Sequence, residues 1–179
     1  TEECDDVSVG STFDLRNSTI DDIYNAYDAL MDSYPQYITK NLLGHGGDSN
    51  GNDDLSLPIY EYVISTGQTT QNTWKGMNTS LYDAPLFLLQ SGTHGDEKSA
   101  VWSMYLFIKQ MMEKFATDDI LGSIKSNINF KILPILNPAG YNVHSRRNAR
   151  NVNINRNFSY NWYSETAGDK GSAPYSELE

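Results

Sequence analysis

The stretch "LFLLQSGTHGDEKSAVWSMYLF" at residues 86–107 decides the fold, because one short turn joins two different hydrophobic patterns. Residues 84–91 form a continuous apolar run, which is typical of a strand buried on both faces. Over residues 100–115 apolar side chains recur at helical spacing, which predicts an amphipathic helix of roughly five turns. The turn between the two patterns consists of small residues and presents His94 and Glu97. A strand, a tight turn and a helix in this order indicate an α/β domain.

The patterns on either side predict further helices and strands. Residues 18–35, "STIDDIYNAYDALMDSYP", predict a first helix, in which Thr19 and Asp22 have capping-box spacing. An alternating strand is expected at 57–65 and a third strand at 128–136. The remaining expectations are a loop at 44–54, a long hairpin loop at 66–83 and a short helix near 118–124. Since strands alternate with helices, the loops should gather at the carboxyl ends of the strands.

Composition and charge limit the kind of partner. The 179 residues, of which 39% are hydrophobic, suit one domain, and no apolar run approaches the ~20 residues that span a membrane. With a net charge of −10, nucleic acid is not expected as the main partner. Residues 137–158 nevertheless hold four of the five arginines and no acid. An isolated basic patch on an acidic protein favours a small anion, and a solvated basic face is the alternative.

The turn offers two side chains that suit a metal ion. His94 and Glu97 form an H-x-x-E pair where the strand passes into the helix. If the helix begins near Asp96, both side chains can converge on one point and bind zinc. The alternative is structural: His94 caps the helix, and Glu97 favours its positive N-terminus. So short a pattern does not decide between the two.

The arginine-rich segment offers groups that bind a carboxylate. Asn155 and Arg156 place a neutral donor next to a guanidinium with fork geometry. Arg146 is a candidate for stabilising a developing oxyanion beside a metal. Both this segment and the His94 turn follow strands, so we expect them to be neighbours in space and to form one site.

The order of motifs resembles the zinc metallocarboxypeptidase family, typified by carboxypeptidase A. The motifs are H-x-x-E at 94–97, N-P-x-G-Y at 137–141, R-x-N at 146–148, N-R-N-F at 155–158 and P-Y-S-E at 174–177. The resemblance runs from about residue 12 to residue 179. It implies a three-layer α/β/α fold with a mixed, twisted sheet. It also implies zinc-dependent hydrolysis of a peptide bond next to a free C-terminal carboxylate.

The resemblance implies a role for each matching residue. His94 and Glu97 would be zinc ligands, and Arg146 would polarise the scissile carbonyl and stabilise the oxyanion. Asn155 and Arg156 would hold the terminal carboxylate of the substrate. The walls of the site would be packed by two aromatic residues, Tyr141 and Phe158.

The sequence departs from the family pattern at three points. Where the family has an aspartate that orients the ligand histidine, this chain has Asn153, which can accept the imidazole N–H but raises ligand basicity less. Ala139 replaces the usual aspartate of N-P-D-G, a minor variation of the turn. The family also has a later histidine ligand and a later catalytic glutamate. Neither His45 nor His144 lies in the right context to be that ligand.

We therefore expect residues 1–179 to be the N-terminal portion of one catalytic domain, with a fold that is incomplete at its C-terminus and inactive alone. The third zinc ligand and the catalytic glutamate are expected beyond residue 179 or on a companion chain. The substrate would be an ordinary peptide or a peptidoglycan stem peptide, and a secreted, extracellular location is favoured. The alternative is a truncated or degenerate non-catalytic module that binds carboxylate termini or serves as a structural part of a larger assembly. Asn153 favours this alternative, and the intact H-x-x-E and N-R pairs oppose it.

Overall fold

The computed structural model of the protein describes residues 17–66, 72–74, 77–79, 84–164 and 167–179. Its central sheet has the order β1-β2-β6-β5, in which β2 pairs antiparallel with β1 and β6, and β5 pairs parallel with β6. The strands are β1 (Ile38–Gly47), β2 (Asp53–Ile64), β5 (Leu86–Gln90) and β6 (Asn129–Leu133). Within the hairpin loop expected at 66–83, β3 (Asn72–Trp74) pairs with β4 (Met77–Thr79), and the other parts of that loop lie mostly outside the described residues. The expected α/β class with a mixed sheet is confirmed.

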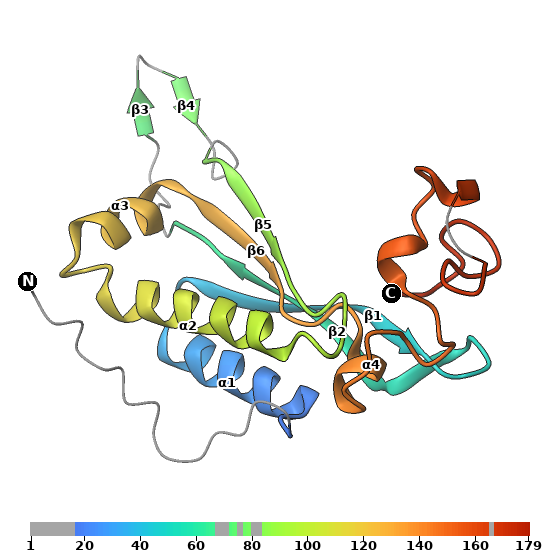
Figure 1. The fold of residues 1–179 in the computed structure, drawn as a ribbon. Helices are drawn as coiled ribbons and strands as arrows, with labels where there is room; N and C mark the ends of the chain where they lie inside the picture. The colour runs from blue at the N-terminus through green and yellow to red at the C-terminus, as the bar shows by residue number, and fades with distance from the viewer. Residues whose placement is uncertain (1–16, 67–71, 75–76, 80–83, 165–166) are drawn as a thin grey trace, which may run out of the picture.

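Two long helices pack along the sheet. Helices α1 (Ile20–Ser33) and α2 (Lys98–Lys114) lie side by side, with α3 (Asp119–Asn127) and α4 (Pro138–Asn142) at opposite ends (Figure 1). Together with the sheet they form one core cluster, whose fully buried members include Ile23, Ile64, Ile108 and Ile132. The strands expected at 57–65 and 128–136 and the helices expected at 100–115 and 118–124 are confirmed, with shifted ends. In the described part of the chain, no helix is both long and apolar enough to cross a bilayer.

Helix α1 begins as its sequence predicts. The hydroxyl of Thr19 accepts the backbone N–H of Asp22 at 3.3 Å, and the Asp22 carboxylate accepts the backbone N–H of Thr19 at 2.7 Å. This reciprocal capping box satisfies two donors that a helix start leaves without partners. On the inner face of the helix, the ring of Tyr27 stacks on Tyr62 of β2 with 4.8 Å between the ring centroids.

The loop expected at 44–54 is shorter than predicted. Strand β1 runs to Gly47 and β2 begins at Asp53, so the turn covers only residues 48–52. Pairing with β2 continues through the glycine-rich end of β1 with two register irregularities, because backbone hydrogen bonds between strands outweigh a weak local preference. Asp48 closes the turn by accepting the backbone N–H groups of Asn50 and Asn52 at 2.7 and 2.9 Å.

The prediction that residues 84–91 form a strand buried on both faces is wrong. Leu86, Phe87 and Leu88 of β5 are 56%, 52% and 60% exposed. The reason is the strand order: β5 is an edge strand, and β6 is its one neighbour among the described residues. An exposed apolar edge strand is a site at which another strand can pair.

Candidate metal centre and anion-binding site

The turns that follow β5 and β6 lie against each other at one end of the sheet. Because the two strands are parallel, both deliver the residues that follow them to the same edge. The backbone N–H of Asn137 donates to the carbonyl oxygen of Gly92 at 2.9 Å. A Cβ atom at Gly95 would overlap the carbonyl carbon of Gly140, so only glycine fits at this contact. The expected proximity of the two segments is therefore confirmed.

His94 is buried, and both of its ring nitrogens have a partner. Only 6% of the residue is exposed; Nε2 lies 3.0 Å from Asn153 Oδ1, and Nδ1 lies 2.9 Å from Glu97 Oε1. The same Asn153 atom accepts the backbone N–H of Asn155 at 3.2 Å, which identifies it as the amide oxygen. Nε2 of His94 therefore carries a proton and donates it to Asn153. In the neutral ring, the lone pair of Nδ1 then points at Glu97.

The contact between His94 Nδ1 and Glu97 brings two acceptors together, which is unfavourable unless the ring is protonated or a cation lies between them. A divalent metal satisfies both atoms, and imidazole nitrogen with carboxylate oxygen is a donor set that zinc accepts. Within residues 17–66, 72–74, 77–79, 84–164 and 167–179, no three His, Cys, Asp or Glu side chains are grouped so as to hold a metal. Catalytic zinc normally has three protein ligands and a water. His94 and Glu97 thus fit as part of a zinc site and not as a complete one.

Glu97 also has a cationic neighbour. Arg146 Nη1 lies 3.0 Å from Glu97 Oε1, and both side chains are about half exposed. Partial burial acts to raise the pKa of Glu97, but the hydrogen bonds and charges of a protonated His94 ring and of Arg146 outweigh it and hold the pKa below its ordinary value. Glu97 is therefore ionised at neutral pH, as a metal ligand must be. It is the N-cap of α2, which begins at Lys98 and not near Asp96 as expected.

The candidate carboxylate-binding pair lies on a short 3-10 helix, Ile154–Arg156, whose N-cap is Asn153. The Asn155 side chain is exposed. Arg156 is partly buried, and its guanidinium donates to the carbonyl oxygen of Asn155 at 3.1 Å. Because Asn153 bonds both to His94 and to the backbone of Asn155, it connects the metal-binding pair to the carboxylate-binding pair.

Two arginines of the basic segment have structural partners instead of facing an anion. Arg147 forms an ion pair with Asp169 at 2.9 Å, and Arg150 forms one with Glu177 at 3.3 Å. Both acids belong to the C-terminal segment, residues 167–179. The expectation of an isolated basic patch is therefore wrong for these two residues, because the patch is partly neutralised by a segment that follows it in the chain.

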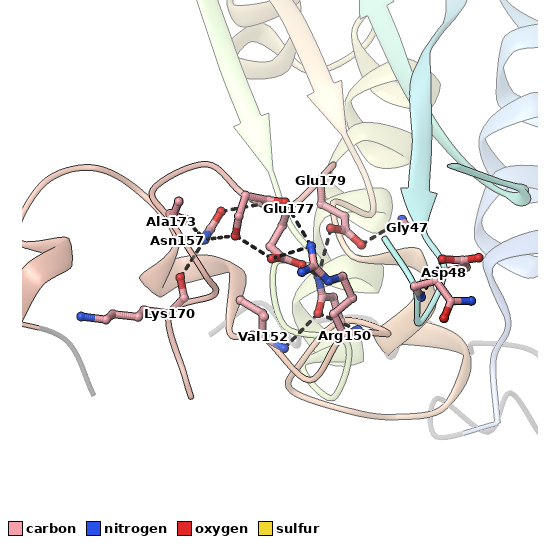
Figure 2. A network of polar contacts seen from close by, with 12 residues as sticks. Gly47, Asp48, Arg150, Val152, Asn157, Lys170, Ala173, Glu177 and Glu179 are labelled. Atoms are coloured by element: carbon pink, nitrogen blue, oxygen red, sulfur yellow. Dashed lines mark hydrogen bonds and ion pairs between the residues drawn. The ribbon is translucent and has the colours of Figure 1, made fainter. Parts of the chain in front are cut away.

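Asn157 is a buried residue that sequence reasoning missed. The two hydrogens of its side-chain NH2 group are shared among three acceptors, and its Oδ1 accepts one hydrogen bond, all with the C-terminal segment. The partners are the carbonyl oxygens of Lys170 and Ala173 at 2.7 and 3.0 Å, Ser176 Oγ at 3.0 Å and the backbone N–H of Glu177 at 3.2 Å. Figure 2 shows this amide in a network that extends to Glu179, whose carboxylate accepts the backbone N–H of Gly47 at 3.4 Å. No local pattern marks Asn157, because its partners lie 13 to 20 residues further along the chain.

The two aromatic residues expected on the walls of the site differ in position. Tyr141 is fully buried, and its hydroxyl lies 2.9 Å from Ser18 Oγ. It therefore packs in the core against the segment before α1, and the expectation that it lines the wall of the site is wrong. The reason is that α4 directs this side chain toward α1 and α2. Phe158 is 48% exposed and packs edge-to-face on Tyr175 at 6.0 Å. These two rings line a cavity of about 120 Å³ together with Ile154, Asn157, Glu177 and Glu179.

Comparison with known proteins gives the family. The sequence profile described as zinc carboxypeptidase matches residues 23–179. The chain belongs to the zinc carboxypeptidase family. Carboxypeptidase B of Astacus astacus is 28% identical over 120 residues, which cover 54% of this chain and 38% of that protein. The chain spans less than half the length of the curated relatives that it matches.

Solved structures of other proteins share the fold. Thrombin activatable fibrinolysis inhibitor has a TM-score of 0.70 at 17% identity, and the match covers 91% of this chain and 42% of that one. Carboxypeptidase A of Helicoverpa armigera has a TM-score of 0.66 at 21% identity, covering 94% of this chain and 42% of that one. At these identities the likeness shows the fold alone. Zinc and peptide substrates belong to the family as a whole.

Proposed function

We propose that the chain is the N-terminal portion of the catalytic domain of a zinc metallocarboxypeptidase, which hydrolyses the peptide bond next to a free C-terminal carboxylate. The observation that carries this proposal is the contact between His94 Nδ1 and the Glu97 carboxylate at 2.9 Å, beside the guanidinium of Arg146. With a neutral ring both atoms are acceptors, so a cation between them removes their repulsion, and zinc is the cation of the family.

Each residue of the site has a distinct task in this proposal. His94 and Glu97 hold zinc, which when bound supplies a Lewis acid for the scissile carbonyl and for water. Asn153 sets the tautomer and direction of the His94 ring. Arg146 stabilises the developing oxyanion from its position beside the metal-binding pair. Its neighbour Arg147 pairs with Asp169 of the C-terminal segment, whereas Arg146 pairs with Glu97 of the metal-binding pair, which supports Arg146 for this task.

Asn155 and Arg156 bind the terminal carboxylate of the substrate by hydrogen bonds from an amide and a guanidinium. Their 3-10 helix starts at Asn153, which contacts His94, so the anion-binding groups lie close to the metal-binding pair. This spacing suits cleavage of the last peptide bond of a chain. An ordinary peptide and a peptidoglycan stem peptide both present the free carboxylate that these groups recognise.

The third zinc ligand and the general base come, in this proposal, from a further part of the domain, on the same polypeptide or on a companion chain. The exposed side chains of β5, Leu86, Phe87 and Leu88, support this, because such an edge is stable when another strand pairs with it. The greater length of the relatives supports it as well. By themselves these 179 residues bind zinc weakly and lack a general base, so they are expected to be inactive.

Zinc binding tests the metal-binding pair directly. Calorimetric titration of metal-free protein with Zn²⁺ should give one bound ion, and both His94→Ala and Glu97→Gln should weaken binding by at least about tenfold. The matched control is His144→Asn, which removes an exposed histidine outside the site and keeps a residue that tolerates its positive φ of 53°. Zinc binding that survives His94→Ala would overturn the proposal.

A second candidate function is a non-catalytic module that binds carboxylate termini. The neutral Asn153 beside His94 favours it, because an amide raises the basicity of a ligand histidine less than a carboxylate does. Assays on a polypeptide that includes the remaining part of the domain distinguish the peptidase from the non-catalytic module. Hydrolysis of an N-acylated dipeptide with a free carboxylate, but not of its amide, supports the peptidase. Binding of the same dipeptide without hydrolysis supports the module.

A further inference from the structure

Helix α2 begins in an unusual way next to the metal-binding pair. Its N-cap, Glu97, makes no side-chain capping hydrogen bond. Its first residue is Lys98, which places a cation at the positive end of the helix dipole. Lys98 is only 3% exposed, and a buried ammonium is unfavourable unless other groups compensate it. Since all three features oppose a helix start at this position, the contacts of Lys98 must offset them.

Lys98 belongs to a compact buried group that joins three elements. Its Nζ donates to the carbonyl oxygen of Ser18 at 2.6 Å, just before α1, and lies 4.5 Å from the ring centroid of Tyr141 in α4. The hydroxyls of Ser18 and Tyr141 lie 2.9 Å apart. The indole N–H of Trp102, one turn further along α2, lies 3.2 Å from each of these hydroxyl oxygens. We call Lys98, Ser18, Trp102 and Tyr141 the Lys98 cluster.

The Lys98 cluster adjoins the metal-binding pair, because Lys98 directly follows Glu97 in the chain. Consecutive residues of a helix point about 100° apart, so the first turn of α2 can direct Lys98 inward while Glu97 faces His94. Anchoring Lys98 therefore fixes the backbone that carries Glu97. Tyr141 adds a second tie, because its neighbour Gly140 packs against Gly95 in the same turn.

We infer that Lys98 is a positioning residue: by anchoring the first turn of α2 to Ser18 and Tyr141, it holds the Glu97 carboxylate against His94 in the geometry that zinc binding requires. The inference rests on the proposed function, since it assigns a support to the proposed metal-binding pair. It also makes the short segment before α1 a part of that support.

The chain contains a second buried lysine that serves as a matched control. Lys125 of α3 is 2% exposed, its Nζ donates to the carbonyl oxygen of Ser65 at 2.8 Å, and it lies 3.8 Å from the ring centroid of Tyr37. Burial, backbone acceptor and aromatic neighbour thus match those of Lys98. Helix α3 lies at the end of the sheet opposite to α4 (Figure 1), and the contacts that Lys125 makes among the described residues are with Ser65, Tyr37 and Phe115.

The test compares Lys98→Met with Lys125→Met, because methionine keeps an unbranched side chain of similar length without the charge. Zinc affinity is measured by competition with a chromophoric chelator, and the free energy of unfolding by urea denaturation. Both variants should lose stability. Lys98→Met should also bind zinc about tenfold more weakly, as expected when the support of a ligand is removed. Lys125→Met should keep the zinc affinity of the wild type.

A milder variant covers the case in which Lys98→Met does not fold. Tyr141→Phe keeps the ring beside Lys98 but removes the hydroxyl that contacts Ser18 and Trp102. It should stay folded and show a smaller loss of zinc affinity in the same direction. A spectroscopic readout accompanies both variants: the nitrogen resonance of His94 Nδ1 should shift less on addition of zinc than in the wild type.

Three outcomes have distinct meanings. Weaker zinc binding by Lys98→Met and Tyr141→Phe, with no change in Lys125→Met, supports the inference. A folded Lys98→Met protein with the zinc affinity of the wild type overturns it, as does an equal loss in Lys125→Met. If the wild type binds no zinc even on a polypeptide that includes the remaining part of the domain, the proposed function fails, and the inference that depends on it fails too.

Discussion

The two ends of the sheet are held together by different kinds of contact. At the end that carries His94, backbone packs on backbone where Gly95 meets Gly140. Neutral amides add further links, with Asn153 bonded to His94 and Asn157 bonded to the C-terminal segment. Ion pairs of Arg147 and Arg150 and the buried Lys98 also contribute contacts at this end. Backbone contacts and amides do not titrate, so the packing of Gly95 on Gly140 and the bonds of Asn153 and Asn157 should not depend on the ionisation of their own groups.

At the opposite end a buried lysine with a lowered pKa holds a helix. Helix α3 is held there by Lys125, whose ammonium donates to the carbonyl oxygen of Ser65 and lies over the ring of Tyr37. Burial lowers the pKa of Lys125 to about 8. The difference teaches that changes near His94 should alter both zinc binding and stability, whereas changes around α3 should alter stability alone.

The largest effect is expected for Gly95→Ala, which breaks the backbone contact. The new Cβ would overlap the backbone of Gly140 and Tyr141, which cannot rotate away as a side chain can. The free energy of unfolding should therefore fall by more than the ~1–3 kcal/mol of ordinary overpacking. Urea denaturation measures the loss. At the control position, Gly44, a Cβ meets nothing within 4 Å, so Gly44→Ala should change stability by less than about 0.5 kcal/mol. Equal stability of the two variants would contradict this account.

Asn157→Ala removes the amide that connects the site to the C-terminal segment. It leaves the carbonyl groups of Lys170 and Ala173 without this donor, so the free energy of unfolding should fall by about 2–3 kcal/mol. Hydrogen exchange at the backbone amide of Glu177 should become faster. The control is Asn127→Ala, which removes one exposed hydrogen bond and should have little effect. Unchanged exchange in residues 167–179 would show that Asn157 does not hold this segment.

The pH dependence of stability tests the opposite end of the sheet. The pKa of Lys125 is lowered from 10.5 to about 8, so between these values the unfolded chain binds more protons than the folded one. Keeping the buried Lys125 amine protonated therefore costs stability at neutral pH, and this cost becomes smaller as pH rises. Compared with Lys125→Met, the wild type should gain about 2 kcal/mol between pH 8 and pH 10.

The comparison with Lys125→Met also removes the contribution of the tyrosines. Burial raises the pKa values of Tyr24 and Tyr27, which lowers the stability of both proteins above pH 10. A stability difference that stays constant from pH 8 to pH 10 would contradict the assignment to Lys125.

The smallest effect is expected for Asn153→Asp, which tests the contact with His94 at the metal-binding end of the sheet. A carboxylate at this position accepts the same His94 Nε2 proton and raises the basicity of Nδ1, so zinc should bind about tenfold more tightly. Chelator competition measures this affinity. Asn155→Asp adds the same charge to an exposed side chain two residues away. An equal gain in Asn155→Asp would mean that overall charge, and not the contact with His94, determines the affinity.

Part of the fold and part of the site could be predicted from the sequence. Helix α1 was predictable because its capping box and its apolar face lie within one short segment. The neighbourhood of His94 and Arg146 was predictable because both follow strands that were expected in one sheet. The partners of Arg147 and Arg150 were not, since Asp169 and Glu177 reach them only after the chain has folded back.

The sequence by itself determined the strand, turn and helix around His94 and Glu97, and the ordered motifs that place the chain in its family. These features depend on periodicity and hydrogen bonds between residues that are close in the chain. Only the tertiary structure decided that β5 is an exposed edge, that Lys98 is buried and that Asn157 holds the C-terminal segment. Strand order, burial and the choice of hydrogen-bond partner depend on segments distant in sequence, which no local pattern encodes.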